Sequence, residues 1–353
     1  MRVSIVGAGI AGLSLAVELA RLGVEARVYE QALPGHGATG RSAGILVTIL
    51  PPDLLPLALE SLEAYKGLPE AKGHWAPRQS LWVAPEGCAS KVVEAHERAG
   101  LPVRRVEDPS RVLGVDFRLG RGEEAWLVRE YLVDTGWAPG ALAALAEGLG
   151  VEIVQGRVER RGGWFYHEGD PLEGPVVVAA GAWTGMLAPE VAGLLRVYRC
   201  QAGTVRGAAP RLIVEDDVEG YYLVPFGGDW YNIGDGANTL IEDPEEGFRP
   251  DPEDTYTVLE RYANRVEAAW EARVEQYWSA PCNVGVDGFP LAGRVEEDLY
   301  VLTGLDGAGV SLGPALARRL ARHIARGTPL PGWASRLDRE PAGRWPAEPY
   351  DIC

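Results

Sequence analysis

Three glycines near the start of the chain could bind the phosphates of a dinucleotide. Gly7, Gly9 and Gly12 follow a short β-branched run, and a helical pattern of apolar residues begins among them. The first glycine allows a tight turn, the second lets a pyrophosphate approach the backbone, and the third lets the helix pack closely on the sheet. The helix N-terminus then offers N–H groups and a positive dipole end to the phosphates.

A carboxylate lies where such a site would recognise a ribose. Glu30 ends the next apolar run, about 20 residues beyond the glycines, where an acidic side chain accepts hydrogen bonds from the ribose hydroxyls. An acid at this place repels a 2′-phosphate, so NADP is the least favoured dinucleotide. The fingerprint alone does not separate FAD from NAD, and a turn that uses glycine only for packing is the simpler alternative.

A second glycine-rich segment predicts another wall of the same site. Residues 37–44 read Gly-Ala-Thr-Gly-Arg-Ser-Ala-Gly and have neither periodicity nor an apolar face. A surface linker is the mundane interpretation. However, the segment leads directly into the apolar run 45–50, which must be buried, so a loop that lies against the cofactor is the better prediction.

Two buried runs farther along the chain would place loops at the same edge of a sheet. Residues 176–183 form an apolar run that ends in glycine and an aromatic residue, as is typical of a central parallel strand. Residues 299–303 form another, and the glycine-rich segment 304–309 opens a helix predicted over 311–326. Ligands of open parallel sheets bind at the carboxyl ends of the strands, so both segments are expected beside the dinucleotide.

The fold class predicted from these patterns is α/β. A Rossmann-type domain, with a parallel sheet and helices, is interleaved with a second domain on a mixed, mainly antiparallel sheet. The first domain is expected to comprise 1–76, 138–195 and 280–353, and the second 77–137 and 196–279. Strands are predicted at 78–84, 124–131, 151–154, 196–205, 211–214, 221–225, 230–234 and 276–278, and helices at 53–65, 90–99, 138–148 and within 254–273.

Composition narrows the class of protein. The net charge of −16 argues against a nucleic-acid partner, because binding to phosphates needs clustered basic residues. The four cysteines, Cys88, Cys200, Cys282 and Cys353, are scattered without a C-x-x-C pair. This pattern argues against zinc, iron–sulfur clusters and a disulfide framework, so no metal is expected and a reducing cytoplasm fits.

Met1 runs straight into the first strand without a signal peptide, and no apolar run reaches the ~18 residues of a membrane span. Peripheral membrane contact is left open.

Taken together, the glycine segments resemble the D-amino acid oxidase superfamily of FAD-dependent oxidoreductases. That superfamily includes glycine oxidase, sarcosine oxidase and the dye-linked amino acid dehydrogenases. Four segments carry the resemblance, in the right order: 7–12 with Glu30, 37–44, 176–183, and 287–290 followed by 304–314.

The resemblance implies FAD, bound without a covalent link. Its adenine end would lie at the first βαβ unit and Val158, and its isoalloxazine ring between the loop at 41–42 and the loop at 304–311. The residues expected to contact FAD are Gly7, Gly9, Ile10, Ala11, Gly12, Glu30, Gly40, Arg41, Ser42, Ala43, Val158, Ala180, Gly181, Trp183, Gly304, Gly307, Ala308, Gly309, Val310 and Ser311.

The reaction implied by the resemblance is oxidation of the CH–NH bond of an amino acid or secondary amine. Hydride passes to flavin N5, and water hydrolyses the resulting imine. Such chemistry depends more on how the substrate is positioned against the flavin than on acid–base groups, because the lone pair of the deprotonated amine drives hydride loss. Two alternatives stay open: an FAD-dependent 2-hydroxy acid dehydrogenase, and an FAD-holding subunit of a larger dehydrogenase complex. The electron acceptor, either oxygen or a quinone or dye, is also open, as are substrate handedness and a homo-oligomeric state.

One departure from the superfamily bears on the substrate. Members that bind an amino acid carboxylate often carry an arginine about five residues before the Asp-Gly-x-Pro turn, where this chain has Cys282, and the lysine of N-methyl amino acid oxidases is replaced by Ser311 or a neighbour. A buried carboxylate is poorly held without an arginine. Either another arginine binds the carboxylate, with Arg41, Arg78 and Arg199 as candidates, or the substrate is not a simple amino acid.

Two tyrosines lie on the strand that lines the substrate face in the superfamily. Strand alternation lets only one of Tyr221 and Tyr222 face the site, and Tyr222 is favoured. Tyr222 and Arg41 are therefore expected to position the substrate. Cys282 is expected to be a buried structural thiol rather than a covalent flavin link, since it is displaced by two positions from the cysteine used in sarcosine oxidase.

Overall fold

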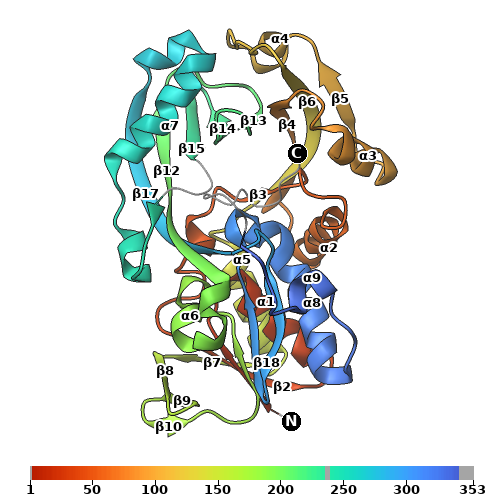
Figure 1. Cartoon of the computed structure of the whole chain (residues 1–353), viewed down its shortest axis with the longest axis vertical. Coiled ribbons are helices and arrows are strands. Elements are labelled where there is room, and N and C mark those ends of the chain that lie inside the picture. The colour runs from red at the N-terminus through yellow and green to blue at the C-terminus, as the bar shows by residue number, and fades with distance from the viewer. Residues whose placement is uncertain (1, 235–238, 342–353) are drawn as a thin grey trace.

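A computed structural model describes residues 2–234 and 239–341. Two lobes lie one above the other along the longest axis of the molecule (Figure 1). The lower lobe contains both the first and the last strand–helix units of the sequence, and the upper lobe contains most of the middle of the chain. The chain therefore passes between the lobes several times, as an interleaved arrangement requires.

The lower lobe is built on a six-stranded sheet with the order β18-β19-β11-β1-β2-β7. All neighbouring strands are parallel except β18, which runs antiparallel to β19. The strands are β1 (Arg2–Val6), β2 (Glu25–Glu30), β7 (Glu152–Gln155), β11 (Val176–Val178), β18 (Leu291–Glu296) and β19 (Leu299–Thr303). This is the Rossmann-like sheet that the sequence predicts, and that prediction is confirmed.

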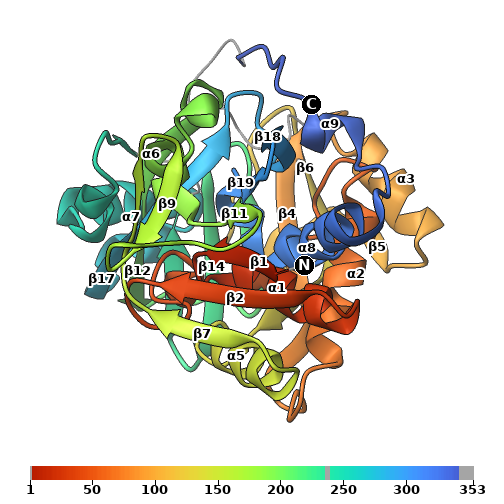
Figure 2. The same ribbon diagram turned by 90° about the horizontal axis from the view of Figure 1, so that it is seen from below.

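Helices with buried apolar faces cover this sheet. Figure 2 shows α1 (Ile10–Arg21) and α8 (Gly309–Arg326) beside the strands, and the two helices pack against each other. Helix α5 (Ala138–Gly148) packs on α1, and α2 (Leu55–Lys66) packs on α8. Their apolar residues form one core cluster with β1 and β2. Burial of this cluster holds the N-termini of α1 and α8 at the carboxyl ends of the strands.

The upper lobe is built on a curled, mixed sheet. Its strand order is β16-β12-β15-β14-β13-β4-β6-β3, with β17 paired to β12 and β5 paired to β6. The strands are β3 (Ile45–Leu46), β4 (Trp75–Pro85), β5 (Val103–Val106), β6 (Glu123–Val133), β12 (Leu195–Arg206), β13 (Ile213–Asp216), β14 (Tyr221–Gly227), β15 (Trp230–Gly234), β16 (Thr239–Leu240) and β17 (Arg273–Gly285). One face packs on α7 (Pro252–Arg265), and the opposite face is turned toward the loops of the lower lobe.

Smaller elements complete the described chain. A three-stranded sheet is formed by β8 (Val158–Arg161), β9 (Trp164–His167) and β10 (Asp170–Pro171). The short helices are α3 (Ser90–Arg98), α4 (Pro109–Leu113), α6 (Thr184–Leu187) and α9 (Gly332–Ser335). The 3-10 turns are η1 (Thr39–Arg41), η2 (Gly181–Trp183), η3 (Pro189–Leu194), η4 (Pro244–Phe248), η5 (Glu267–Glu271) and η6 (Asp306–Ala308).

Several predicted elements differ from the observed ones. The strand expected over 176–183 ends at Val178, and η2 occupies its last three positions. The strand expected over 276–278 is part of the much longer β17. The expected domain boundary between 279 and 280 falls inside β17, and β3 joins the upper sheet although it lies within the expected segment 1–76. The division into two domains at these boundaries therefore stays a prediction.

The cysteines correct another expectation. Cys88 is disulfide-bonded, whereas Cys200 and Cys282 are thiols. The expectation against disulfides is therefore wrong for Cys88, because wide spacing in the sequence says nothing about distance in the fold. The cysteine pattern therefore no longer supports a reducing compartment.

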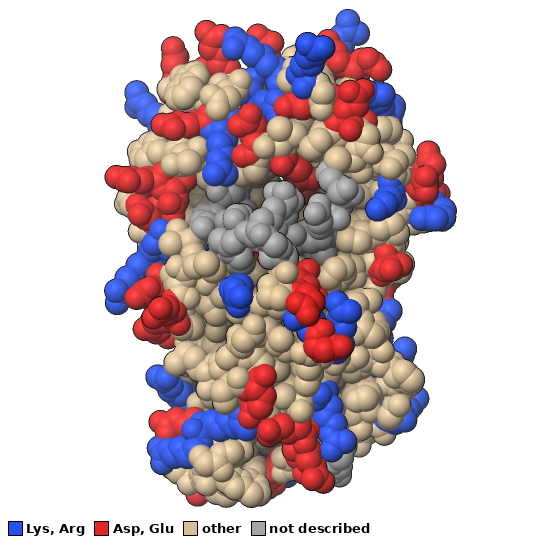
Figure 3. Space-filling model, viewed as in Figure 1, with Lys and Arg blue, Asp and Glu red and all other residues tan. Residues whose placement is uncertain are grey.

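None of the helices in residues 2–234 and 239–341 combines the length and the apolar character needed to cross a bilayer. On the face shown in Figure 3, basic and acidic side chains are interspersed at both ends of the molecule.

Candidate active site

A cavity of about 1540 Å³ is lined by loops of the lower lobe and by strands of the upper lobe. Its walls come from segments that are far apart in the sequence, including 6–11, 36–43, 179–183 and 302–310. A pocket for a single ligand has a volume of about 300–1,000 Å³. The cavity therefore has room for a long cofactor and a second, smaller molecule beside it.

The first wall is the turn between β1 and α1. Gly7 has φ +109°, and a Cβ placed there would lie 2.4 Å from the carbonyl oxygen of Ala179. A Cβ on Gly12 would lie only 2.0 Å from the carbonyl oxygen of Gly7, so the helix packs directly against the turn. Gly9 precedes the helix without a capping side chain, and the Ile10 N–H donates to Thr39 Oγ1 at 3.2 Å. This bare helix N-terminus fits a pyrophosphate.

Glu30 is held at the cavity by backbone amides. Its Oε2 accepts a hydrogen bond from the N–H of Ala8 at 2.8 Å, and its Oε1 accepts one from the N–H of Ala32 at 2.9 Å. Arg157 and Val158 lie in the same part of the lining. A carboxylate fixed in this way still has lone pairs for a ribose hydroxyl, so the arrangement fits the adenosine half of FAD.

The second wall is the glycine-rich loop around η1. The guanidinium of Arg41 donates to the carbonyl oxygens of His36 and Gly37 and lies 4.6 Å from the ring centroid of Phe248. Burial lowers the pKa of Arg41 from its ordinary value. The indole Nε1 of Trp278, on β17, donates to the carbonyl oxygen of Arg41 at 2.9 Å. This bond attaches the loop to the upper sheet.

The third wall joins β17 to the loop that precedes α8. Asn283 Nδ2 donates to Thr303 Oγ1 at 2.7 Å and to the carbonyl oxygen of Gly181 at 2.9 Å, while its Oδ1 accepts from the N–H of Gly304 at 3.3 Å. One amide side chain thus joins β17 to the segments that follow β11 and β19. Asn283 was not identified from the sequence, because it lies five residues beyond the strand expected at 276–278 and inside the longer β17 that the structure shows.

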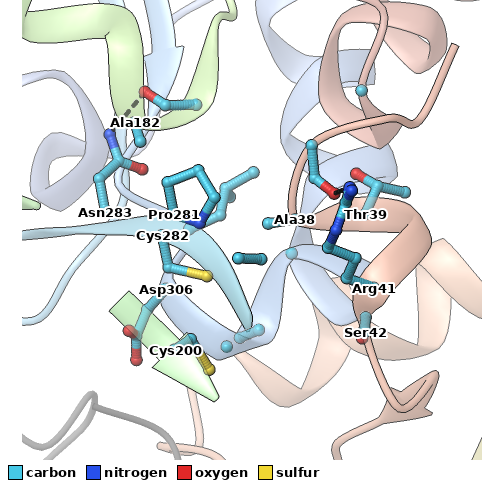
Figure 4. A pocket seen from close by; sticks show the side chains of 18 of the residues that line it. Ala38, Thr39, Arg41, Ser42, Ala182, Cys200, Pro281, Cys282, Asn283 and Asp306 are labelled. Atoms are coloured by element: carbon cyan, nitrogen blue, oxygen red, sulfur yellow. Dashed lines mark hydrogen bonds between the residues drawn. The ribbon is translucent and has the colours of Figure 1, made fainter. Parts of the chain in front are cut away.

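An acidic group lies in the same wall. The hydroxyl of Tyr198 donates to Asp306 Oδ1, and Asp306 Oδ2 has no hydrogen-bond partner among the described residues. Burial raises the pKa of Asp306 to about 6. Figure 4 shows Cys200, Cys282 and Asp306 close together on one side of the cavity, with Thr39, Arg41 and Ser42 on the other. Cys282, at the position of the expected arginine, therefore lies beside one other thiol and a carboxyl group.

The roof of the cavity is the inner face of the upper sheet. Tyr222 lines the cavity and packs with Ala43 and Ile45 of the second wall. Tyr221 also borders the cavity, but its ring packs on the other face of the sheet, where it lies 5.9 Å from that of Tyr262 in the core. Glu215, directly opposite Tyr222 on β13, also lines the cavity. Glu215 was not identified from the sequence. Because side chains alternate along a strand, Glu215 lies on the same face of β13 as Ile213 and on the opposite face from the buried Val214, and this alternation could have indicated it.

Most residues expected at the cofactor lie on the cavity wall. Those that line it are Gly7, Gly9, Ile10, Ala11, Glu30, Arg41, Ser42, Ala43, Val158, Ala180, Gly181, Trp183, Gly304, Gly307, Ala308, Gly309 and Val310, together with Tyr222. Gly12, Gly40 and Ser311 lie behind the wall. Gly40 donates its N–H to the carbonyl oxygen of Gly35 at 2.9 Å, and Ser311 Oγ accepts from the N–H of Val47 at 2.8 Å. These three residues shape the loops rather than line the cavity.

Of the three arginines expected to bind a substrate carboxylate, only Arg41 lines the cavity. Arg199 forms an ion pair with Asp254 on α7 at 2.7 Å. Arg78 is exposed and lines a separate, shallow pocket of the upper sheet. Both were expected from sequence alone, which does not show the partners that tertiary contacts provide.

Comparisons with known proteins agree with this arrangement. The model of a family described as FAD-dependent oxidoreductases matches residues 2–323. Glycine oxidase of Geobacillus kaustophilus is 26% identical over 92% of this chain and 93% of its own length. A bifunctional protein of tRNA 5-methylaminomethyl-2-thiouridine biosynthesis, from Idiomarina loihiensis, is 27% identical over 91% of this chain and 55% of its own length. The chain thus spans about half the length of such bifunctional relatives.

Solved structures with the same fold were also found. L-proline dehydrogenase from P. horikoshii superposes with a TM-score of 0.79 at 20% identity, covering 93% of this chain and 94% of that one. Glycine oxidase from Geobacillus kaustophilus superposes with a TM-score of 0.72 at 24% identity, covering 93% of this chain and 96% of that one. At these identities the superpositions show the fold.

Proposed function

Because the chain belongs to the family of FAD-dependent oxidoreductases, we propose that it oxidises the CH–NH bond of a small amino acid or secondary amine. FAD is its cofactor, as the resemblance implied. The product would be an imine, which water hydrolyses. The relatives named for their substrates, glycine oxidase and L-proline dehydrogenase, act on compounds of this class.

The observation that carries the proposal is the size and lining of the cavity. Its glycine-lined part fits the dinucleotide, and its volume of about 1540 Å³ leaves room for a second molecule under the upper sheet. Tyr222 lies on that sheet, where a phenol could orient the substrate by a hydrogen bond. The substrate would therefore be held between the sheet and the loops at 39–43 and 304–310.

The bound FAD supplies the hydride acceptor, its N5 atom. The chain supplies position and charge. Helix α8 begins at Gly309, and its first residues line the cavity, so its positive dipole end can stabilise negative charge that develops there. Two loops would hold the flavin ring and the substrate in position. They are the loop at 39–43, which is fixed by the hydrogen bond from Trp278, and the loop at 304–310, which is fixed by the hydrogen bond to Asn283. We further propose that the cofactor is bound non-covalently and that Cys282 stays a thiol.

The visible spectrum of the purified protein, before and after acid precipitation, tests for bound and covalent flavin. Anaerobic mixing with proline, glycine, sarcosine and D-amino acids should then bleach the long-wavelength flavin band for at least one of them. Bleaching only by 2-hydroxy acids would instead favour the hydroxy acid dehydrogenase. Tightly bound flavin that no compound reduces would favour an FAD-holding subunit. Reoxidation by oxygen or only by a dye separates an oxidase from a dehydrogenase.

A pair of variants tests the role of the tyrosine. Tyr222→Phe removes a hydroxyl at the cavity, whereas Tyr221→Phe removes one in the core. Since a hydrogen bond to a charged group contributes about 1.5–3 kcal/mol, Tyr222→Phe should lower kcat/KM by roughly tenfold or more without changing flavin content. Tyr221→Phe should leave kcat/KM unchanged. Equal effects of both variants would contradict a substrate-orienting role for Tyr222.

A further inference from the structure

Two carboxyl groups meet at the roof of the cavity. Glu215 lies on β13 and lines the cavity, while Glu130 lies on β6 and is completely buried. The two carboxyl groups are in hydrogen-bonding contact with each other. Within the described residues, Oε1 of Glu215 and Oε2 of Glu130 are buried and no N–H group donates to them; the hydroxyl of Ser80 is the other side-chain group in contact with Glu130. Because ionised carboxylates only accept hydrogen bonds, the pair must share a proton.

The groups around the pair add no compensating positive charge. The N–H of Thr48 donates to Glu130 Oε1 at 3.2 Å, and Thr48 Oγ1 lies 3.0 Å from Nε2 of the buried His96. Asp217 adds a further negative charge near Glu130. No arginine or lysine within residues 2–234 and 239–341 forms an ion pair with either glutamate, and none is among the main causes of their pKa shifts. Burial raises the pKa of both carboxyl groups, and the contact with Glu130 raises the pKa of Glu215 further.

The pair faces the part of the cavity where a substrate would lie. Glu215 belongs to a row of residues on the inner face of the upper sheet, one from each of five neighbouring strands. The row consists of Glu215, Tyr222, Gly234, Ala202 and Trp278. At its far end, Trp278 donates to the carbonyl oxygen of Arg41 in the second wall. Glu215 therefore lies on the sheet face that covers the loop at 39–43.

The opposite wall has the same electrostatic character. The position expected for a carboxylate-binding arginine holds Cys282, and Asp306 lines the cavity nearby with an unpaired Oδ2 among the described atoms. The guanidinium of Arg41 lies over Phe248 and already donates to two carbonyl oxygens. A site with these groups suits a cation better than a carboxylate.

We propose that Glu215, paired with Glu130, binds the protonated nitrogen of the substrate and accepts its proton before the carbon–nitrogen bond is oxidised. In this step an N–H bond of the ammonium breaks and its electron pair stays on nitrogen, while an O–H bond forms on the carboxyl oxygen that lacks a proton. The pair passes from one shared proton to two. This deepens the proposed function and rests on it: the substrate class is a cationic amine that is recognised through its nitrogen.

Binding of unreactive probes to the flavin-loaded protein tests the proposal. tert-Butylammonium has no hydrogen on the carbon next to nitrogen, so it cannot be oxidised, and pivalate and tert-butanol have nearly the same shape with negative and zero charge. Titrations at pH 8, followed by the visible flavin spectrum, should give at least tenfold tighter binding for the cation than for either other probe.

Three variants separate the role of the pair from general acidity. Glu215→Gln should weaken binding of tert-butylammonium at least tenfold and leave that of tert-butanol within twofold. Glu219→Gln removes the same charge from another residue of the lining and should change neither. Glu130→Gln leaves Glu215 as the only titrating carboxyl group of the pair and replaces the donating carboxylic O–H by an amide N–H. Since the carboxylic O–H is the stronger donor, its loss raises the pKa at which Glu215 takes up a proton. Binding of the cation is lost as pH falls through this pKa, so its midpoint should move to higher pH.

The outcomes distinguish this inference from the proposed function. Tighter binding of pivalate than of tert-butylammonium, undetectable binding of the cation, or equal losses in Glu215→Gln and Glu219→Gln would each overturn the inference, even if amines reduce the flavin. If tert-butylammonium binds as expected but no amine reduces the flavin, the proposed function fails instead. If Glu215→Gln loses its flavin, two measurements still test the inference: the preference of the wild type among the three probes, and the pH shift of cation binding in Glu130→Gln.

Discussion

Replacing Gly12 by alanine should disrupt the cofactor site through the backbone. A Cβ at this position would lie 2.0 Å from the carbonyl oxygen and 3.1 Å from the carbonyl carbon of Gly7, and 3.5 Å from Ala179 Cβ. The closest neighbour is backbone in a tight turn, so no rotamer change relieves the contact. Helix α1 would have to move away from β1 by more than about an ångström to restore normal van der Waals separation.

The expected magnitude follows from two opposing effects. Adding a methyl group to a well-packed site costs about 1–3 kcal/mol, and the upper end applies here because backbone must shift. Alanine in a helix interior gains roughly 1 kcal/mol over glycine. The net loss is about 2 kcal/mol, or about 4–8 °C in Tm for a domain of this kind. Flavin affinity should fall as well, because the displaced helix carries the phosphate-binding N–H groups.

Two other glycines serve as matched controls. A Cβ on Gly140, in helix α5 and away from the cavity, would meet no described atom within 4 Å, so Gly140→Ala should not lower the Tm and should keep the wild-type flavin content. A Cβ on Gly9 would lie 3.4 Å from Thr39 Oγ1, an ordinary contact. Gly9→Ala should therefore weaken FAD binding without lowering the Tm of the apoprotein. Flavin absorbance and thermal unfolding of apo and loaded proteins measure these effects. A Gly12→Ala protein that melts with the wild type and keeps its flavin would refute the reasoning.

Three further outcomes are expected from the described contacts. Burial raises the pKa of Asp306 to about 6, above its value in the unfolded chain. The folded state therefore loses stability as pH rises from about 4 to 6, and Asp306→Asn should make the Tm less dependent on pH over that range. Arg265, buried on α7, forms ion pairs with Asp216 at 2.8 Å and with Glu123 at 2.6 Å. Asp216→Ala should therefore lower the free energy of unfolding by about 3–5 kcal/mol. Arg206→Ala, which removes the exposed ion pair with Asp229, should lower it by less than about 1 kcal/mol. Cys282→Arg should lower the Kd of pivalate, measured by flavin spectra, by at least tenfold; an unchanged Kd would show that position 282 does not contact a substrate carboxylate.

The parts of the fold that sequence predicted are those set by local contacts. Gly7 and Gly12 meet within one strand–turn–helix unit, so their spacing alone defines the packing. The sheet of β8, β9 and β10 was missed because its segment is rich in charged residues and glycine and leaves Trp164 largely exposed. The length of β17 was missed for a related reason: its first five residues, 273–277, are mostly polar and largely exposed, so they show no apolar alternation.

In the site, sequence identified residues but not their partners. Arg199 was a reasonable carboxylate ligand until its ion pair with Asp254 on α7 was visible. Glu130 and Glu215 each lie in a strand that also carries other charged residues, so the sequence shows neither that these two carboxyl groups are buried nor what they contact. Their contact depends on the strand order β13-β4-β6, and a parallel pair such as β13 with β4 has no local signal in the chain.

The two ends of the cavity are therefore determined by different kinds of interaction. At the cofactor end, contacts are made by backbone: glycines that admit no Cβ, and amides that hold Glu30. Few substitutions are tolerated there, and the pattern is readable from sequence. At the substrate end, contacts are made by side chains that project from the inner face of a sheet, where Glu215 or Cys282 can change without altering the backbone. A few substitutions can thus change the substrate class while the FAD site stays the same. Membership of the family therefore identifies the cofactor, whereas the substrate class must be inferred from the charged side chains of the upper sheet.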